Sequence, residues 1–132
     1  MFDLIYLKDN RIFLIQVKDG FGASIRDACS QIQIAAEIIE NNLNLNNTSE
    51  LDEYYLEFKK HNQNLSKEEF LSMLKKDRCY VLAFSTKEVF SESNYLCKKF
   101  QSEIAKFEIL GQSHEFRANG REFLVTNIKK QN

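Results

Sequence analysis

Three polar side chains near the start of the chain, Asp3, Gln16 and Lys18, are of types that bind a metal ion and act on a phosphodiester. A carboxylate and an amide oxygen are hard ligands of the kind that Mg²⁺ prefers. The backbone carbonyl of Val17 could add a third oxygen. A lysine beside such a metal could orient its bound water or stabilise charge on the phosphoryl group. These residues therefore predict a metal-dependent phosphodiesterase site.

A β-hairpin is expected to bring the three side chains to one end of a sheet. Asp9-Asn10 is a two-residue turn signal between two apolar runs and suits a type I′ turn. Counted outward from this turn, the expected pairs are Lys8–Arg11, Leu7–Ile12, Ile5–Leu14 and Asp3–Gln16. Opposed residues share a face and side chains alternate along a strand, so Asp3, Gln16 and Lys18 should converge. Polar groups buried there without partners would be costly, which favours a ligand-binding role.

The alternative interpretation of the same residues is structural. Asp3 and Gln16 would then form a pair that closes the open end of the hairpin. Lys18 would be a solvated residue at the end of its strand.

A long helix should follow the hairpin, from about Ile25 to Asn42, with Ser24 as its N-cap and Asp27 completing a capping-box-like pattern. Its apolar seam has helical spacing and should pack on the sheet. The exposed amides of a helix N-terminus favour phosphate. Ser24 and Arg26 are therefore candidate nucleic-acid-binding residues, while the alternative for Arg26 is an ordinary surface position.

The remaining segments predict a single α/β domain over residues 1–132. The core should comprise 1–44 and 78–132, with a helical insertion at 45–77 that begins at an Asn-rich breaker. Cys79–Phe84 is a continuous apolar run typical of a central buried strand. A further helix is expected to end at Gly111, and Asn119-Gly120 predicts a C-terminal hairpin. The expected fold is thus a mixed central sheet with an N-terminal hairpin, a long helix on one face, the insertion and a C-terminal hairpin.

Composition sets limits on function. The chain has 132 residues, is 43% hydrophobic and carries a net charge of −1, so it predicts a folded domain rather than a charged disordered tail. No apolar run is long enough for a membrane span, and the N-terminus has no secretory signal, so we expect a cytoplasmic protein without membrane contact. The three cysteines, Cys29, Cys79 and Cys97, lack paired spacing and are expected to be free thiols. Residues 78–132 hold nine basic and six acidic side chains, so a DNA-tracking surface would draw on this part, from Arg78 onward.

An acid, a hairpin turn, a triplet that ends in lysine and then a helix together resemble the PD-(D/E)xK nuclease superfamily. The triplet here is Gln16-Val17-Lys18, similar to the Q-x-K variant of Mrr-like restriction and Holliday-junction-resolvase-like endonucleases. The resemblance covers residues 1–45 and, more loosely, the strand at 78–84. It implies a restriction-endonuclease-like core and a DNA endonuclease of restriction or defence type that uses Mg²⁺ or Mn²⁺. Asp3, Gln16 and Lys18 would be catalytic, with Asp3, Gln16 and Val17 as metal ligands.

Two departures from that family leave a second function open. Gln16 carries no charge, which lowers the expected metal affinity, and only Met1 and Phe2 precede Asp3 where the family has a helix with a glutamate. The chain is then expected to be a fragment of a larger protein, one part of a split nuclease, or a degenerate copy. The alternative function is a non-catalytic binding or assembly module, working as a homodimer or with a partner polypeptide that supplies the missing elements. An unrelated α/β interaction protein remains the third reading if the hairpin register is wrong.

Overall fold

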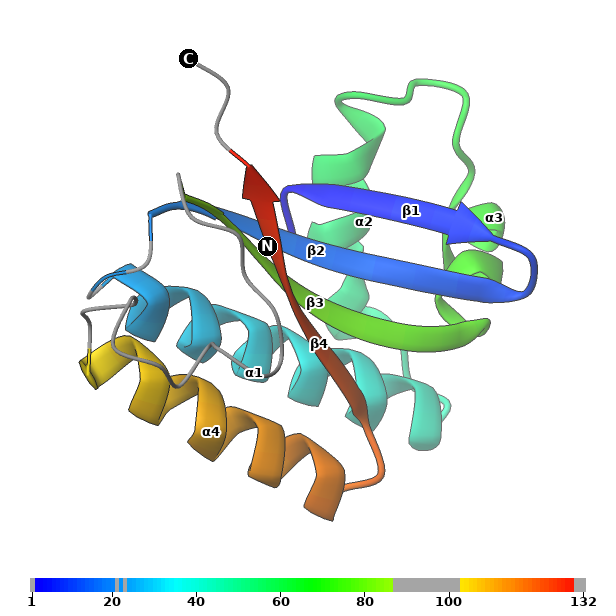
Figure 1. Cartoon of the computed structure of the whole chain (residues 1–132). Coiled ribbons are helices and arrows are strands. Elements are labelled where there is room, and N and C mark those ends of the chain that lie inside the picture. Colours follow the sequence, from blue (N-terminus) through cyan, green and yellow to red (C-terminus); the bar gives the residue numbers. More distant parts are fainter. Residues whose placement is uncertain (1, 21, 23, 87–102, 130–132) are drawn as a thin grey trace.

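A four-stranded mixed sheet organises the chain (Figure 1). The computed structural model describes residues 2–20, 22, 24–86 and 103–129. The strands β1 (Leu4–Lys8), β2 (Arg11–Asp19), β3 (Asp77–Thr86) and β4 (Glu122–Lys129) lie in the order β1-β2-β3-β4. The helices are α1 (Ser24–Asn44), the 3₁₀ helix η1 (Ser49–Leu51), α2 (Asp52–Lys59), α3 (Lys67–Leu74) and α4 (Glu103–Ala118). β1 is antiparallel to β2, whereas β2, β3 and β4 are parallel, which confirms the predicted α/β fold with a mixed sheet.

The N-terminal hairpin has the predicted register over the length of β1. Lys8 pairs with Arg11, Leu7 with Ile12 and Ile5 with Leu14. In the turn, Asp9 has a φ of 56° but Asn10 does not adopt a positive φ, so the turn is not the expected type I′, which needs both. Regular pairing stops at Leu4–Ile15.

The helices pack against one face of the sheet. The strand residues in the main core are those that register places on a single face, namely Ile5, Ile12, Leu14, Tyr80, Leu82, Phe84, Phe123 and Val125. The seam of α1 packs on them through Ile25, Ala28, Cys29, Ile32, Ala35, Ala36 and Ile39. This seam is the one that the helical spacing predicts. None of the described helices has the length and hydropathy that crossing a membrane requires.

The opposite face of the sheet, here called the open face, carries Leu4, Tyr6, Phe13, Ile15, Val81 and Leu124. None of these six side chains belongs to the main core. Leu4 and Tyr6 are each 54% exposed and Leu124 is 43% exposed. The β3 part of this face is buried, since Val81 is 6% exposed and Cys79 and Ala83 are 0% and 2% exposed. The apolar exposure on this face therefore lies at Leu4, Tyr6 and Leu124, and such exposed apolar groups can mark a contact surface.

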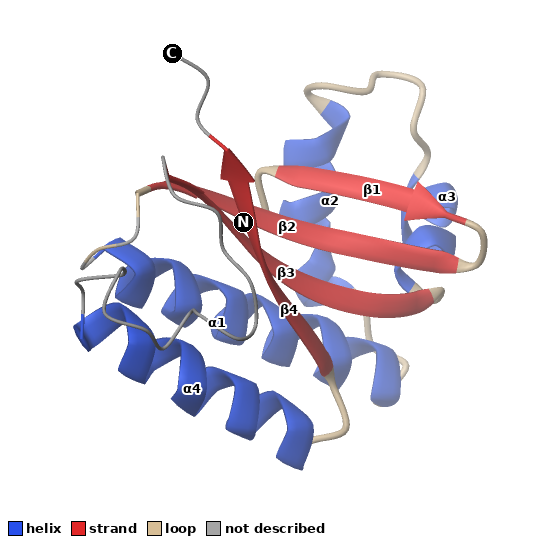
Figure 2. Cartoon of the chain, in the orientation of Figure 1, coloured by secondary structure: helices blue, strands red, loops and turns tan. Residues whose placement is uncertain are grey.

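The insertion at 45–77 joins the same core. Leu51, Phe70 and Leu74 are buried among the core side chains, and the aromatic rings of Tyr55 and Phe58 lie against Phe70. The insertion is helical, as expected, and consists of η1 continuing directly into α2, followed by α3. Figure 2 shows α2 and α3 beside the β1–β2 hairpin, away from α4.

The C-terminal hairpin predicted around Asn119-Gly120 is wrong. Helix α4 continues through Gly111 to Ala118, and β4 pairs in parallel with β3. The Asn-Gly pair is a helix stop: Gly120 has a φ of 68°, and the N–H of Arg121 donates to the carbonyl of Phe116 at 2.9 Å. The N–H of Gly120 donates to the carbonyl of Arg117 at 3.1 Å, which completes a Schellman motif. The same two residue types therefore reverse the chain after a helix instead of between two strands.

A half-buried ion pair ties α1 to β3 at the end of the sheet far from the hairpin opening. Arg78 donates from Nε to Oε1 of Glu40 at 2.7 Å and from Nη2 to Oε2 at 2.8 Å. The hydroxyl of the buried Tyr80 donates to Oε1 of Glu40 at 3.0 Å. Burial raises the pKa of Glu40, but the hydrogen bonds and charge of Arg78 outweigh it, so the pKa lies below its usual value.

Candidate functional site

Asp3 closes the open end of the hairpin with both its backbone and its side chain. Its N–H donates to the carbonyl of Ile15 at 2.9 Å, and its Oδ2 accepts from the N–H of Val17 at 2.8 Å. Asp3 therefore binds the residues on both sides of Gln16 instead of forming a regular pair with Gln16 itself. A carboxylate held in this way keeps its second oxygen for another ligand.

Gln16 lies on the helix-packed face of β2 and is only 6% exposed. Its Nε2 donates to Oε1 of Gln31 on α1 at 3.0 Å. Because the nitrogen and the oxygen of an amide point in different directions, this bond fixes where the carbonyl oxygen of Gln16 points. A fixed amide is better prepared to bind a ligand than a freely rotating one.

Val17 and Lys18 complete the group at this end of β2. The N–H and C=O of one strand residue point to the same side, so the carbonyl of Val17 lies on the side where Asp3 accepts from its N–H. Lys18 is half-buried and shares the face of Gln16, beside Phe84 of β3. The ends of β2 and β3 are also joined, since the hydroxyl of Ser85 donates to Oδ1 of Asp19 at 2.8 Å.

The oxygen atoms at this end are of the kinds that hard cations prefer. Asp3, Gln16 and Val17 offer oxygen atoms of three kinds, which are ligands suited to Mg²⁺ or Mn²⁺. The set carries one negative charge, from Asp3, so we expect lower affinity than in a site with two carboxylates. Among the described residues no three His, Cys, Asp or Glu side chains gather into a separate metal-binding group.

The two residues expected to bind nucleic acid, Ser24 and Arg26, lie on the first turn of α1 and not at the end of β2. Ser24 is exposed and is the first residue of the helix. Arg26 turns toward α4, where its Nε lies 3.5 Å from Oε1 of Glu108 and its side chain is 70% exposed. Arg78, which was expected to contribute to a DNA-tracking surface, is committed to Glu40 within the fold.

Gln31 is the site residue that sequence reasoning missed. The helical period shows that Gln31 and Gln33 cannot both face the sheet, but it does not choose between them. The structure places Gln31 at the rim of the α1–sheet interface, against Gln16, and Gln33 toward α4. A buried amide in a strand requires a partner, and that requirement is the signal that could have identified a glutamine on the helix that follows.

Comparison with protein-family models, with curated proteins and with solved structures gives no match for this chain.

Proposed function

We propose that the chain is a metal-dependent phosphodiesterase, a DNA endonuclease of the PD-(D/E)xK type acting in restriction or defence. The observation that carries the proposal is the hydrogen bond from the N–H of Val17 to Asp3, 2.8 Å long. It holds the only acid of the set against the residue that separates Gln16 from Lys18. The topology agrees with such a core, because the hairpin leads into a helix and then a parallel strand.

Each residue has a separate task in this proposal. Asp3, Gln16 and the carbonyl of Val17 would hold Mg²⁺, which supplies an activated water and polarises a phosphoryl oxygen when bound. Gln31 keeps the amide of Gln16 in one orientation. Lys18 stabilises the charge that develops on the phosphoryl oxygens or orients the attacking water.

Plasmid nicking tests the proposal. Purified chain is incubated with supercoiled DNA and Mn²⁺, beside Asp3→Asn, Lys18→Ala and an EDTA control. Lys8→Ala is the matched control variant, because Lys8 is an exposed lysine at the turn end of the same hairpin. We expect nicking by the wild type and Lys8→Ala, and its loss with Asp3→Asn, Lys18→Ala and EDTA. Nicking that survives Lys18→Ala would remove that residue from the reaction.

The alternative function, a non-catalytic assembly module, is favoured by the open face. Leu4, Tyr6 and Leu124 expose apolar surface there, as expected for a domain that works against another polypeptide. Sedimentation over a range of concentrations separates the two functions when combined with the nicking assay. An inactive wild type that self-associates, with association lost in Tyr6→Lys, would favour assembly over hydrolysis.

A further inference from the structure

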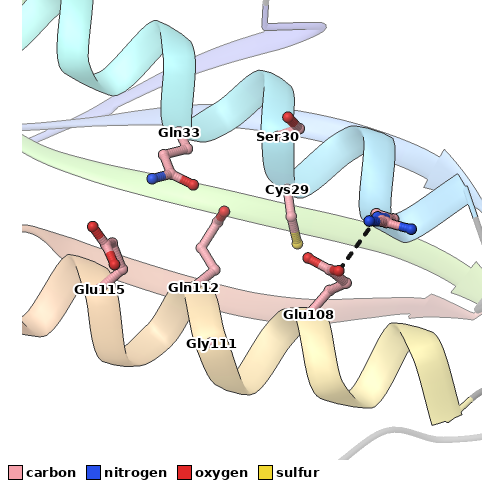
Figure 3. A pocket seen from close by; sticks show the side chains of 8 residues that line it. Cys29, Ser30, Gln33, Glu108, Gly111, Gln112 and Glu115 are labelled. Atoms are coloured by element: carbon pink, nitrogen blue, oxygen red, sulfur yellow. Dashed lines mark ion pairs between the residues drawn. The ribbon is translucent and has the colours of Figure 1, made fainter.

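The surface of the molecule is polar between α1 and α4 but apolar along β1. The cavity between the two helices has a volume of about 420 Å³, and Figure 3 shows the carboxylates of Glu108 and Glu115 among its lining side chains. Along β1, by contrast, Leu4 and Tyr6 are each 54% exposed and Leu7 is 43% exposed. Exposed apolar side chains that follow one another along a single strand mark a contact surface.

The backbone of β1 is open along its outer side. In the described part of the chain, β1 has β2 on one side and no strand on the other. Lys8 and Arg11 close the two-residue turn, so they form a hydrogen-bonded pair, and the pairing alternates from there. The N–H and C=O groups of Tyr6 therefore face β2, whereas those of Ile5 and Leu7 face outward. Such a row of outward donors and acceptors can pair with a further strand.

The sequence of β1 does not protect this edge. Edge strands are usually protected by charged residues, prolines or bulges. From Leu4 to Leu7, β1 has no charged residue and no proline, and its pairing with β2 is unbroken. The other edge strand, β4, differs, because the exposed Glu122 and Thr126 flank Leu124. Of the two edges, β1 is therefore the one suited to bind another strand.

We infer that β1 pairs with β1 of a second copy of this chain, antiparallel and about a two-fold axis at Tyr6, so that the two sheets become one continuous sheet. This register pairs every residue of the strand. Tyr6 lies opposite the partner's Tyr6, Ile5 opposite the partner's Leu7, and Leu4 opposite the partner's Lys8. The outward groups of Ile5 and Leu7 exchange two hydrogen bonds in each of their two pairs, so the edge of β1 is satisfied.

The side chains and charges of β1 suit a second copy. The two Tyr6 rings meet at a pair that is not hydrogen-bonded, where opposed side chains lie closest, and aromatic pairs are favourable there. The methylene groups of Lys8 cover the partner's Leu4 while its ammonium group reaches solvent. The antiparallel arrangement places the two Lys8 side chains at opposite ends of the contact. The net charge of each chain is −1, so the two copies repel each other little.

The size of the contact sets its strength. β1 has five residues, so the contact is one short strand pair with its flanking side chains. Stable complexes bury about 1,200 Å² or more, and a contact of this length buries less. The dimer is therefore weak and depends on concentration. It does not involve the Asp3–Gln16 group and is independent of the proposed phosphodiesterase activity.

Sedimentation of the full chain over a concentration series tests the inference. Leu7→Pro removes an N–H that faces outward and none that binds β2, so the hairpin is kept while dimerisation should weaken at least tenfold. Leu124→Lys is the matched control, because it replaces an exposed leucine of the same sheet away from β1, and it should dimerise as the wild type does. Dimerisation lost in Leu124→Lys but kept in Leu7→Pro would overturn the inference and assign the contact to the open face.

Cross-linking keeps the inference testable if Leu7→Pro disturbs the hairpin. In a Cys97→Ser background, Tyr6→Cys places two thiols on the two-fold axis, where the Cα atoms are about 4.5 Å apart, within the range of a disulfide. Leu4→Cys is equally exposed on the same face but lies far from its copy. We expect mild oxidation to link Tyr6→Cys at least tenfold faster than Leu4→Cys. Equal rates overturn the inference, and so does a wild type that stays monomeric at millimolar concentration, which would leave another polypeptide as the partner of this edge.

Discussion

Gln16 and Gln31 form an amide–amide hydrogen bond of 3.0 Å that joins strand β2 to helix α1. Strand β2 and helix α1 are consecutive in the chain. The bond therefore links the strand directly to the helix that follows it, beside the proposed metal site. Gln16 is buried while Gln31 lies exposed at the rim. A position that could hold an acid is thus occupied by an amide that the fold orients.

Restoring the charge at this position is the first prediction. Gln16→Glu should raise Mn²⁺ affinity on the order of tenfold, because affinity for hard cations rises with the number of carboxylate ligands. Gln31 can still serve the new side chain, since its amide can turn to donate to a carboxylate. Calorimetric titration with Mn²⁺ measures the change, and Gln63→Glu, at an exposed loop glutamine, is the control. Equal Mn²⁺ affinities of Gln16→Glu and Gln63→Glu would show that Gln16 is not a metal ligand.

The hairpin, the α1 seam and the buried strand β3 were predictable because each rests on local periodicity. Ile5, Leu14 and Tyr80 follow the alternation that one buried face imposes, and the structure places all of them in the core. The α4–β4 connection was not predictable in the same way. Asn119-Gly120 reverses the chain equally well after a strand or a helix, and the choice depends on whether the preceding residues pack as a helix against α1.

The candidate site was predictable in its members but not in its contacts. Residue types and register brought Asp3, Gln16 and Val17 to one end of β2. The hydrogen bond from the Val17 N–H to Asp3 depends on the local twist of the chain where regular pairing stops. The hydrogen bond from Gln16 to Gln31 depends on how α1 is rotated over the sheet. Both hydrogen bonds depend on tertiary packing, which the pattern of residue types along the sequence does not specify.

The ion pair between Glu40 and Arg78 should be important for stability. Removal of one partner leaves the other charge poorly solvated, since the side chains are only 14% and 20% exposed. We expect Glu40→Ala to lower the free energy of unfolding by about 2–4 kcal/mol in urea denaturation. Lys67→Ala, which removes an exposed pair with Asp52, is the control and should lower it by less than about 1 kcal/mol. Comparable losses in the two variants would contradict a special role for the Glu40 pair.

The same glutamate predicts a pH dependence of stability. The folded-state pKa of Glu40 is lowered, so its contribution is present above the unfolded pKa of about 4.3 and is lost as the pH falls through the folded value. Glu40→Gln does not titrate, so its free energy of unfolding should fall less steeply with decreasing pH below about 4.5. Urea unfolding between neutral and acidic pH measures both slopes. Parallel curves for the two proteins would show that other groups govern acid unfolding.

Cys29 and Cys79 should be unreactive in the folded protein. Burial and the charge of Glu108 together raise the pKa of Cys29 to about 12. Burial and two nearby carboxylates, partly opposed by Arg11, raise that of Cys79 to about 11. At pH 8 the thiolate fraction is then at least about a hundredfold below that of a free cysteine, and the thiolate is the reactive form. In a Cys97→Ser background, labelling with a disulfide reagent should be slow until urea unfolds the chain. Fast labelling of the native protein would show that these thiols reach solvent without global unfolding.

The two glycines at the C-terminal side of the fold should respond in opposite directions to the same substitution. Gly120 has a φ of 68° at the end of α4, a conformation that a side chain disfavours, so Gly120→Ala should destabilise the protein by about 1 kcal/mol. Gly111 has no positive φ and open space around it, so Gly111→Ala should stabilise α4 by about 0.5–1 kcal/mol. Urea unfolding of the two variants under one set of conditions gives the sign of each change. A destabilised Gly111→Ala would mean that α4 lies closer to α1 than the cavity between them allows.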